Sequence, residues 1–141
     1  MNKIGLILLA GAALAQAPPN ETPAPVSPYR NVGNMSRLMI DIIYPTSDAI
    51  FYVDRDEPKT EVQWNTLASQ ALMLAESGNL LMMPGRARDG ALWMKQSRAL
   101  IEAGAMAAKA ADAKDAAGLM TAGHLIDLSC DRCHRRYMKL P

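Results

Sequence analysis

The sequence predicts an all-α protein, an antiparallel four-helix bundle. Four successive stretches carry apolar residues at intervals of three and four, which is the spacing of the buried face of a helix. No stretch shows the strict alternation of apolar and polar residues that a surface strand requires. The connections between the stretches are short, and short connections place neighbouring helices antiparallel.

The N-terminus is typical of a secretory signal peptide. Lys3 supplies a positive charge, an apolar run from Ile4 to Ala13 follows, and Ala13-Leu14-Ala15 forms a small-x-small cleavage site. The apolar run is well short of the ~20 residues that cross a bilayer, which disfavours a retained anchor. We therefore expect residues 1–15 to be a signal peptide and the protein to be exported to the bacterial periplasm.

Composition divides the remainder of the chain. Residues 16–33 are rich in proline and poor in apolar side chains, which predicts an extended or disordered leader before a folded domain at residues 34–141. Cleavage would remove Lys3, so that the 15 basic residues of the full chain become 14, equal to its 14 acidic ones. A neutral mature chain disfavours nonspecific nucleic-acid binding. No membrane span is expected after cleavage.

The first helix should begin at Asn34, a good N-cap, and its apolar stripe continues to Val53. Pro45 lies within it. Proline removes a backbone hydrogen bond and clashes with the preceding turn, which predicts a kink between Asp41 and Pro45. Because the apolar phase continues on both sides, we expect one kinked helix.

Capping signals define the other helices. Thr60 and Gln63 form a capping-box pair at the start of the second helix, and Gly78 is its expected end. Asp89 is the expected cap of the third helix. The proline-free stretch that follows is too long for one helix of a small domain, so we expect a turn over residues 111–115, with Asp115 capping the fourth helix.

The fourth helix carries the residues with the clearest chemistry. Cys130-Asp131-Arg132-Cys133-His134 contains the only two cysteines of the chain and matches a covalent haem attachment site. On a helix, Cys130 and Cys133 share a face, so both thiols can add to the vinyl groups of one porphyrin edge. His134 lies on that face and can bind the iron, which implies one haem c, and export agrees with attachment outside the cytoplasm.

Two other uses of the cysteines are less favoured. A thioredoxin-like redox pair requires a βαβ pattern around it, which is missing from the sequence. A zinc site would need a fourth ligand besides Cys130, Cys133 and His134. The only other histidine, His124, lies about 280° round the helix axis from His134 and should be a partly exposed polar residue.

Topology suggests a second ligand for the iron. In an up-down-up-down bundle, the end of the fourth helix lies beside the start of the first, so His134 should face Met35 and Met39. A thioether sulfur is a suitable axial ligand. Met39 is the better candidate, because Met35 belongs to the easily frayed first turn. With 10 methionines in the chain, simple core filling is the alternative for each.

The same topology brings further residues to the haem end. Trp93 should lie near the ring and Trp64 at the opposite end. The loop between the second and third helices carries an apolar run that would cover the haem, namely Leu80, Leu81, Met82 and Met83. Five arginines could pair with the propionates, dock an acidic partner or be ordinary surface charge, namely Arg86, Arg88, Arg132, Arg135 and Arg136.

These features resemble the class II c-type cytochromes, the four-helix cytochromes related to cytochrome c-prime, over residues 34–137. In that family the attachment motif lies near the end of the last helix, with an aromatic residue three positions after the histidine, as Tyr137 is here, and the N-terminal-helix methionine looks like Met39. Low-spin members use that methionine as sixth ligand and carry electrons. Cytochrome c-prime itself binds small gases. Pro45 and the proline-rich leader depart from the pattern.

The leading hypothesis is a periplasmic monohaem electron carrier, not an enzyme, with His134 and Met39 as axial ligands and redox proteins of unknown identity as partners. The alternative is a five-coordinate, gas-binding or gas-sensing protein in which Met39 only packs over the iron. A third hypothesis is an exported helical scaffold or zinc-binding protein. The sequence leaves open whether the bundle forms a homodimer.

Overall fold

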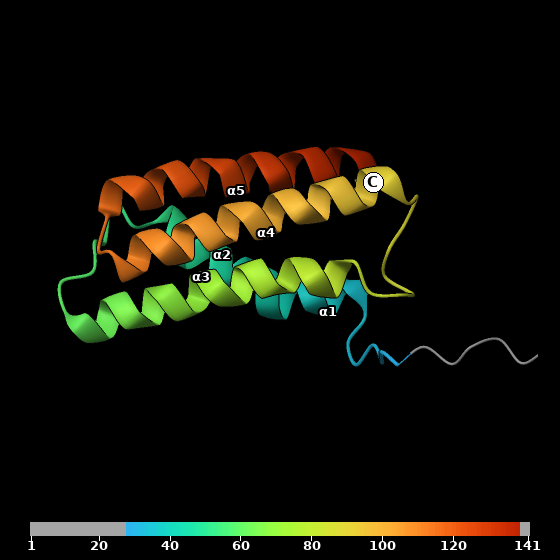
Figure 1. The fold of residues 1–141 in the computed structure, drawn as a ribbon, viewed down its shortest axis with the longest axis horizontal. Helices are drawn as coiled ribbons and strands as arrows, with labels where there is room; N and C mark the ends of the chain where they lie inside the picture. Colours follow the sequence, from blue (N-terminus) through green and yellow to red (C-terminus); the bar gives the residue numbers. More distant parts are fainter. Residues whose placement is uncertain (1–27, 139–141) are drawn as a thin grey trace, which may run out of the picture.

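The computed structural model describes residues 28–138, which fold as an all-helical bundle (Figure 1). No strand occurs within this range. The signal peptide expected at residues 1–15 and most of the predicted leader lie outside the described residues. The elements, in chain order, are α1 (Met35–Leu38), the π-helical turn η1 (Met39–Ile43), α2 (Tyr44–Phe51), α3 (Glu61–Leu81), α4 (Ala91–Asp112) and α5 (Ala116–Tyr137).

The helices lie side by side and alternate in direction (Figure 1). α1, η1 and α2 follow one another without a break and act as the first helix of the bundle. α3 packs against α4, α4 against α5, and α2 contacts both α3 and α5. The C-terminal end of α5 lies at the same end of the bundle as α1, as the predicted topology requires. Over the described part of the chain, no helix is both long enough and apolar enough to cross a membrane.

Small side chains let α3, α4 and α5 approach closely in the core. Ala71, Ala107 and Ala122 are fully buried between the larger Leu74, Leu119 and Ile126. Gly104 marks a close approach of α4 to the backbone of α3, because a Cβ built on it would lie 2.8 Å from the backbone nitrogen of Ala75. The apolar stripes seen in the sequence therefore form one core.

Pro45 is accommodated by a π-helical turn. The backbone N–H of Tyr44 donates to the carbonyl of Met39, five residues earlier, so the helix widens directly before the proline. Proline cannot donate to the preceding turn, and a wider turn avoids its clash there. The hydroxyl of Thr46 donates to the carbonyls of Ile42 and Ile43, at 2.6 and 3.0 Å. The regular α-helix is thus interrupted just before Pro45 by a π-helical turn over Met39–Ile43, which overlaps the segment where a kink was predicted.

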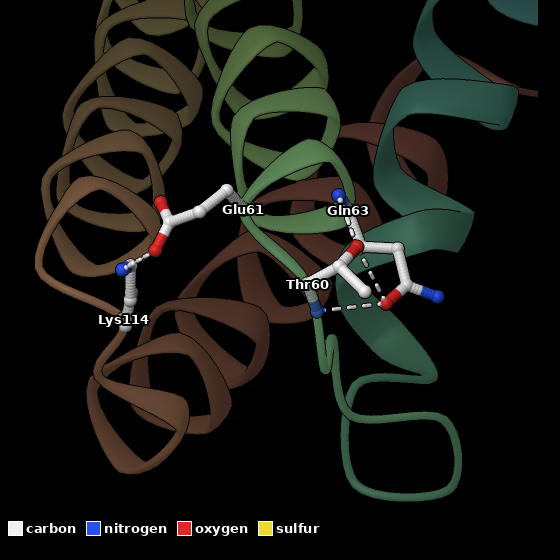
Figure 2. A network of polar contacts seen from close by, with 4 residues as sticks. All are labelled: Thr60, Glu61, Gln63 and Lys114. Atoms are coloured by element: carbon white, nitrogen blue, oxygen red, sulfur yellow. Dashed lines mark hydrogen bonds and ion pairs between the residues drawn. The ribbon is translucent and has the colours of Figure 1, made fainter.

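The capping box at the start of α3 is confirmed, but the predicted end of this helix is wrong. The backbone N–H of Gln63 donates to Thr60 Oγ1 at 3.3 Å, and the Thr60 N–H donates to Gln63 Oε1 at 3.0 Å (Figure 2). α3 passes through Gly78 and ends at Leu81. A Cβ at Gly78 would lie 2.5 Å from Ile101 Cγ1, so this glycine serves close helix packing and not termination.

The predicted cap of α4 is also wrong. The N-cap is Gly90, whose φ of 72° suits glycine, and no side chain caps the helix. Asp89 instead accepts a hydrogen bond from the Tyr137 hydroxyl and lies 3.7 Å from Arg136 Nη2, both at the end of α5. The turn expected over residues 111–115 is confirmed, and Asp115 caps α5 by accepting from the Gly118 N–H at 2.9 Å.

Candidate functional site

The attachment-like motif lies in the last turns of α5 and faces inward. Cys130, Cys133 and His134 are each partly buried, and Cys130 and Cys133 pack against the hydrophobic core. Both cysteines are free thiols. The exposed residue between them, Arg132, lies on the outer side of the helix. The two thiols and the imidazole therefore share the inner face of α5, as their spacing predicts.

Two adjoining cavities meet at this face, and both are lined by Met39, Cys133 and His134. The inner cavity, of about 40 Å³, also reaches Cys130. The remaining residues of its wall are Ile43, Leu81, Gln96, Ser97, Leu100 and Ser129. The outer cavity, of about 140 Å³, is completed by Met35, Arg88, Trp93, Tyr137 and Met138. The structure thus brings together all six residues predicted for the site.

The cavities occur where the first helix leaves α5. α2 packs against α5. The preceding part of the first helix packs mainly against α3, and η1 makes that contact. Met35 on α1 and Met39 on η1 form one wall, and the end of α5 forms the other. The bundle therefore opens between the start of its first helix and the end of its last.

Two aromatic residues form a rigid side of the outer cavity. Trp93, only 3% exposed, donates its indole N–H to the Leu81 carbonyl at 2.8 Å. Its ring meets that of Tyr137 edge to face, with 4.8 Å between centroids and 72° between planes. Partial burial and the hydrogen bond to Asp89 raise the pKa of the Tyr137 phenol above its ordinary value. This side chain is therefore a neutral donor at physiological pH.

The thiols lie in a weakly polar environment. Burial, and to a lesser extent the charge of Asp127 and the neighbouring Cys133, raise the pKa of the Cys130 thiol to about 11. Burial also raises the pKa of the Cys133 thiol. Both groups are protonated at neutral pH, unlike the thiolates of reactive redox cysteines.

The donor set suits a covalently held haem better than a bare metal ion. Within residues 28–138, no three His, Cys, Asp or Glu side chains gather closely enough to hold an ion. Two thiols on one helix face, an imidazole one residue later and a thioether on the opposite wall are the groups that a c-type haem uses. The cavities are smaller than the roughly 300–1,000 Å³ of typical ligand pockets, so a porphyrin would require the walls to part.

Several residues of the site could not be assigned from the motif alone. Gln96, Ser97 and Ser129 add a polar patch to the inner cavity, where the Ser129 hydroxyl donates to the Gln96 carbonyl at 3.4 Å. Helical spacing offered a signal, because Ser97 follows Trp93 by one turn and Ser129 precedes Cys133 by one turn. His124, in contrast, is exposed and lines neither cavity.

The predicted haem cover and arginine cluster are only partly at the site. Of the run from Leu80 to Met83, only Leu81 lines a cavity described above, because the other three line separate hollows around the end of α3. The helical continuation of α3 through Gly78 explains this, since it divides the run between two faces.

The arginines have different roles. Arg88 alone lines the outer cavity. Arg135 Nε lies 2.7 Å from Asp131 Oδ1, and Arg136 Nη2 lies 3.7 Å from Asp89 Oδ2. Arg132 is exposed. Arg86 is buried, donates to the Gly33 carbonyl at 2.9 Å and lines neither of the two cavities.

Comparison with protein-family models, curated proteins and solved structures finds no match to this chain. A functional assignment therefore depends on the side chains around the two cavities. Their common feature is a histidine and a methionine that approach one space from opposite helices, with two thiols at its edge.

Proposed function

We propose that the protein is a periplasmic electron carrier with one covalently bound haem c, a cytochrome of the class II type. The observation that supports it best is the position of Met39. This side chain comes from the first helix, yet it lines the same two cavities as Cys133 and His134. A histidine and a methionine on opposite walls are the ligand pair of low-spin electron-transfer cytochromes.

Each residue has a distinct role in this proposal. Cys130 and Cys133 would hold the porphyrin edge through thioethers, and His134 and Met39 would be the axial ligands. The bound haem would supply a one-electron couple between ferric and ferrous iron. Methionine favours the ferrous state, so the reduction potential should be moderate to high.

In this proposal, the walls of the site would limit the access of water and external ligands to the haem. Trp93 is held by its hydrogen bond to Leu81 and by its contact with Tyr137, so it can exclude water from the outer cavity. Leu100, 5% exposed, and Ile43, 6% exposed, do the same in the inner cavity. Exclusion of water would favour the oxidation state in which the haem carries less net charge. It would also keep external ligands away from the iron.

The test is the spectrum of the exported protein and of Met39→Ala. The unmodified protein should retain haem after denaturation and be six-coordinate and low-spin, with no response to carbon monoxide. Met39→Ala should become high-spin and bind carbon monoxide, because one axial ligand is lost. Met73→Ala is the matched control, since Met73 is 52% exposed on α3 and lines neither cavity.

Other outcomes would change the assignment. Ready binding of carbon monoxide by the unmodified protein would favour the gas-binding alternative, in which Met39 only packs over the iron. An unchanged spectrum in Met39→Ala would transfer the ligand role to Met35, the other methionine on that wall. Zinc in place of iron and porphyrin would refute the haem proposal.

A further inference from the structure

A second concave site lies on another side of the first helix, between this helix and the end of α3. It is a groove of about 360 Å³ and shares no lining residue with the two cavities above. Three arginines line it, Arg30, Arg37 and Arg86, together with one carboxylate, Asp41. Three positive charges and one negative charge give the wall a net charge of +2. The groove is therefore cationic, although the chain as a whole is nearly neutral.

Arg86 is the unusual member of this group. It is 9% exposed, yet within the described part of the chain it forms no salt bridge. Its Nη1 donates to the Leu80 carbonyl at 3.2 Å and to Met83 Sδ at 3.5 Å, and its Nη2 donates to Gly33. Its Nε has no hydrogen-bond partner among residues 28–138. Buried charges in proteins are normally paired, because removal from water is otherwise costly.

The carboxylate in the groove does not supply the missing charge. Asp41 pairs with Arg37 one helical turn away, and this pair is largely exposed. Arg30, also exposed, forms no ion pair with another described residue. The groove thus offers two arginines, Arg30 and Arg86, whose charges are not neutralised by a neighbour.

The walls of the groove are held in place across a long separation in sequence. Asn31 Nδ2 donates to the Pro84 carbonyl at 2.7 Å, and Arg86 donates to the Gly33 carbonyl at 2.9 Å. Both bonds join the segment before α1 to the loop after α3. A preformed site loses less conformational freedom when a ligand binds.

The remaining lining is mostly apolar and consists of Val32, Gly33, Leu38, Ile42, Leu80 and Met83. We propose that this groove binds an amphiphilic carboxylate, such as the anion of a medium-chain fatty acid. The guanidinium groups would hold the carboxylate, and the alkyl chain would lie on the apolar wall. The inference is independent of the haem, because the two sites share no residue.

The experiment is a calorimetric titration of the full-length protein with octanoate, below its micellar concentration. Octanoate should bind saturably, whereas 1-octanol lacks the charge and acetate lacks the chain, so each should bind at least about tenfold more weakly. Arg30→Gln/Arg37→Gln removes two of the three positive charges that line the groove, so that its net charge falls from +2 to 0, and should weaken octanoate binding about tenfold. Both residues are exposed, so the variant should fold.

The matched control is Lys95→Gln/Arg98→Gln, which removes the same charge from exposed positions on α4 outside the groove. This control should bind octanoate as the unmodified protein does. Equal affinity for octanoate and octanol, equal losses in the two double variants, or no saturable binding would each refute the proposal. None of these results depends on whether haem is bound.

Discussion

At the end of the bundle that holds Thr60 and Asp115, capping side chains define where the helices begin, whereas the opposite end, which holds Met39 and His134, contains two cavities between the first helix and α5. The first, here called the turn end, contains the capping box of α3, the cap of α5 and the pair between Glu61 and Lys114 (Figure 2). The second, here called the cofactor end because it holds the proposed haem site, contains the two cavities and the cationic groove.

The difference concerns how the first helix is held. At the turn end, α2 packs against both α3 and α5. At the cofactor end, η1 packs against α3, and the space towards α5 is lined by Met35 and Met39. A site needs such a gap, and rigid elements elsewhere must keep its walls in register. The two ends therefore differ in how the first helix meets α5: α2 packs against α5 at the turn end, and the two cavities lie between η1 and α5 at the cofactor end.

The largest expected effect is confined to the cofactor end. Cys130→Ala/Cys133→Ala removes both thiols, so no haem should remain with the chain after denaturation. The measurement is haem-linked peroxidase staining of the denatured protein, with His124→Ala as control because His124 is exposed and distant from the cavities. Haem that stays attached to the double variant would contradict the proposed site.

A substitution in the tightly packed middle tests whether the close approach of α3 and α4 stabilises the bundle between its two ends. Gly104→Ala would place a Cβ 2.8 Å from the Ala75 nitrogen, so α3 and α4 must separate. Overpacking of this kind should lower the free energy of unfolding by about 1–3 kcal/mol, measured by denaturant titration.

Gly123→Ala is the matched control for that change. The nearest atom to a Cβ there is 3.7 Å away, an ordinary contact, and alanine favours helix by about 0.5–1 kcal/mol. This variant should be as stable as the unmodified protein or more stable. Equal destabilisation by both substitutions would show that the close approach of α3 and α4 is not what Gly104 provides.

A smaller effect is expected from the capping box of the turn end. Thr60→Ala removes the acceptor of the Gln63 N–H and should destabilise the fold by about 1 kcal/mol, seen as a lower melting temperature. Thr66→Ala is its control, because the Thr66 hydroxyl donates a hydrogen bond only to the Val62 carbonyl, at an exposed position in the interior of α3. Equal destabilisation by both substitutions would contradict the capping role of Thr60. Neither residue lines the two cavities, so the spectrum of the proposed haem should be the same in both variants.

The smallest effect is expected from the pair between Glu61 and Lys114. Both side chains are substantially exposed, at 72% and 46%, so Lys114→Gln should change the free energy of unfolding by less than about 1 kcal/mol. The difference should vanish in high salt, where charges are screened. Lys109→Gln is the control, and a loss that persists in salt would mean that Lys114 acts by another route.

The outcomes at single residues show why sequence reasoning succeeded at some positions and not at others. The caps at Thr60 and Asp115 are contacts within three residues of the chain, so they could be predicted locally. The same local rules predicted that Gly78 ends α3 and that Asp89 caps α4, and both predictions were wrong. Each interacts with another helix, Gly78 with α4 and Asp89 with the end of α5.

The candidate site follows the same division. The shared face of Cys130, Cys133 and His134 is a property of helical spacing, and the opposed position of Met39 follows from the order of the helices. The polar patch at Ser97 and Ser129 depends on how α4 and α5 are rotated about their axes. Burial of Arg86 depends on two segments more than fifty residues apart.

The sequence by itself determined the helical periodicity, three of the helix caps (Asn34, Thr60 and Asp115) and the inward face of the attachment-like motif, because these depend on contacts within a few turns of one helix. The tertiary structure alone decided the end of α3, the partners of Asp89 and the position of Arg86 in a cationic groove. The physical reason is range: close packing and buried charge are settled between helices, where no local pattern specifies which residue will be the neighbour.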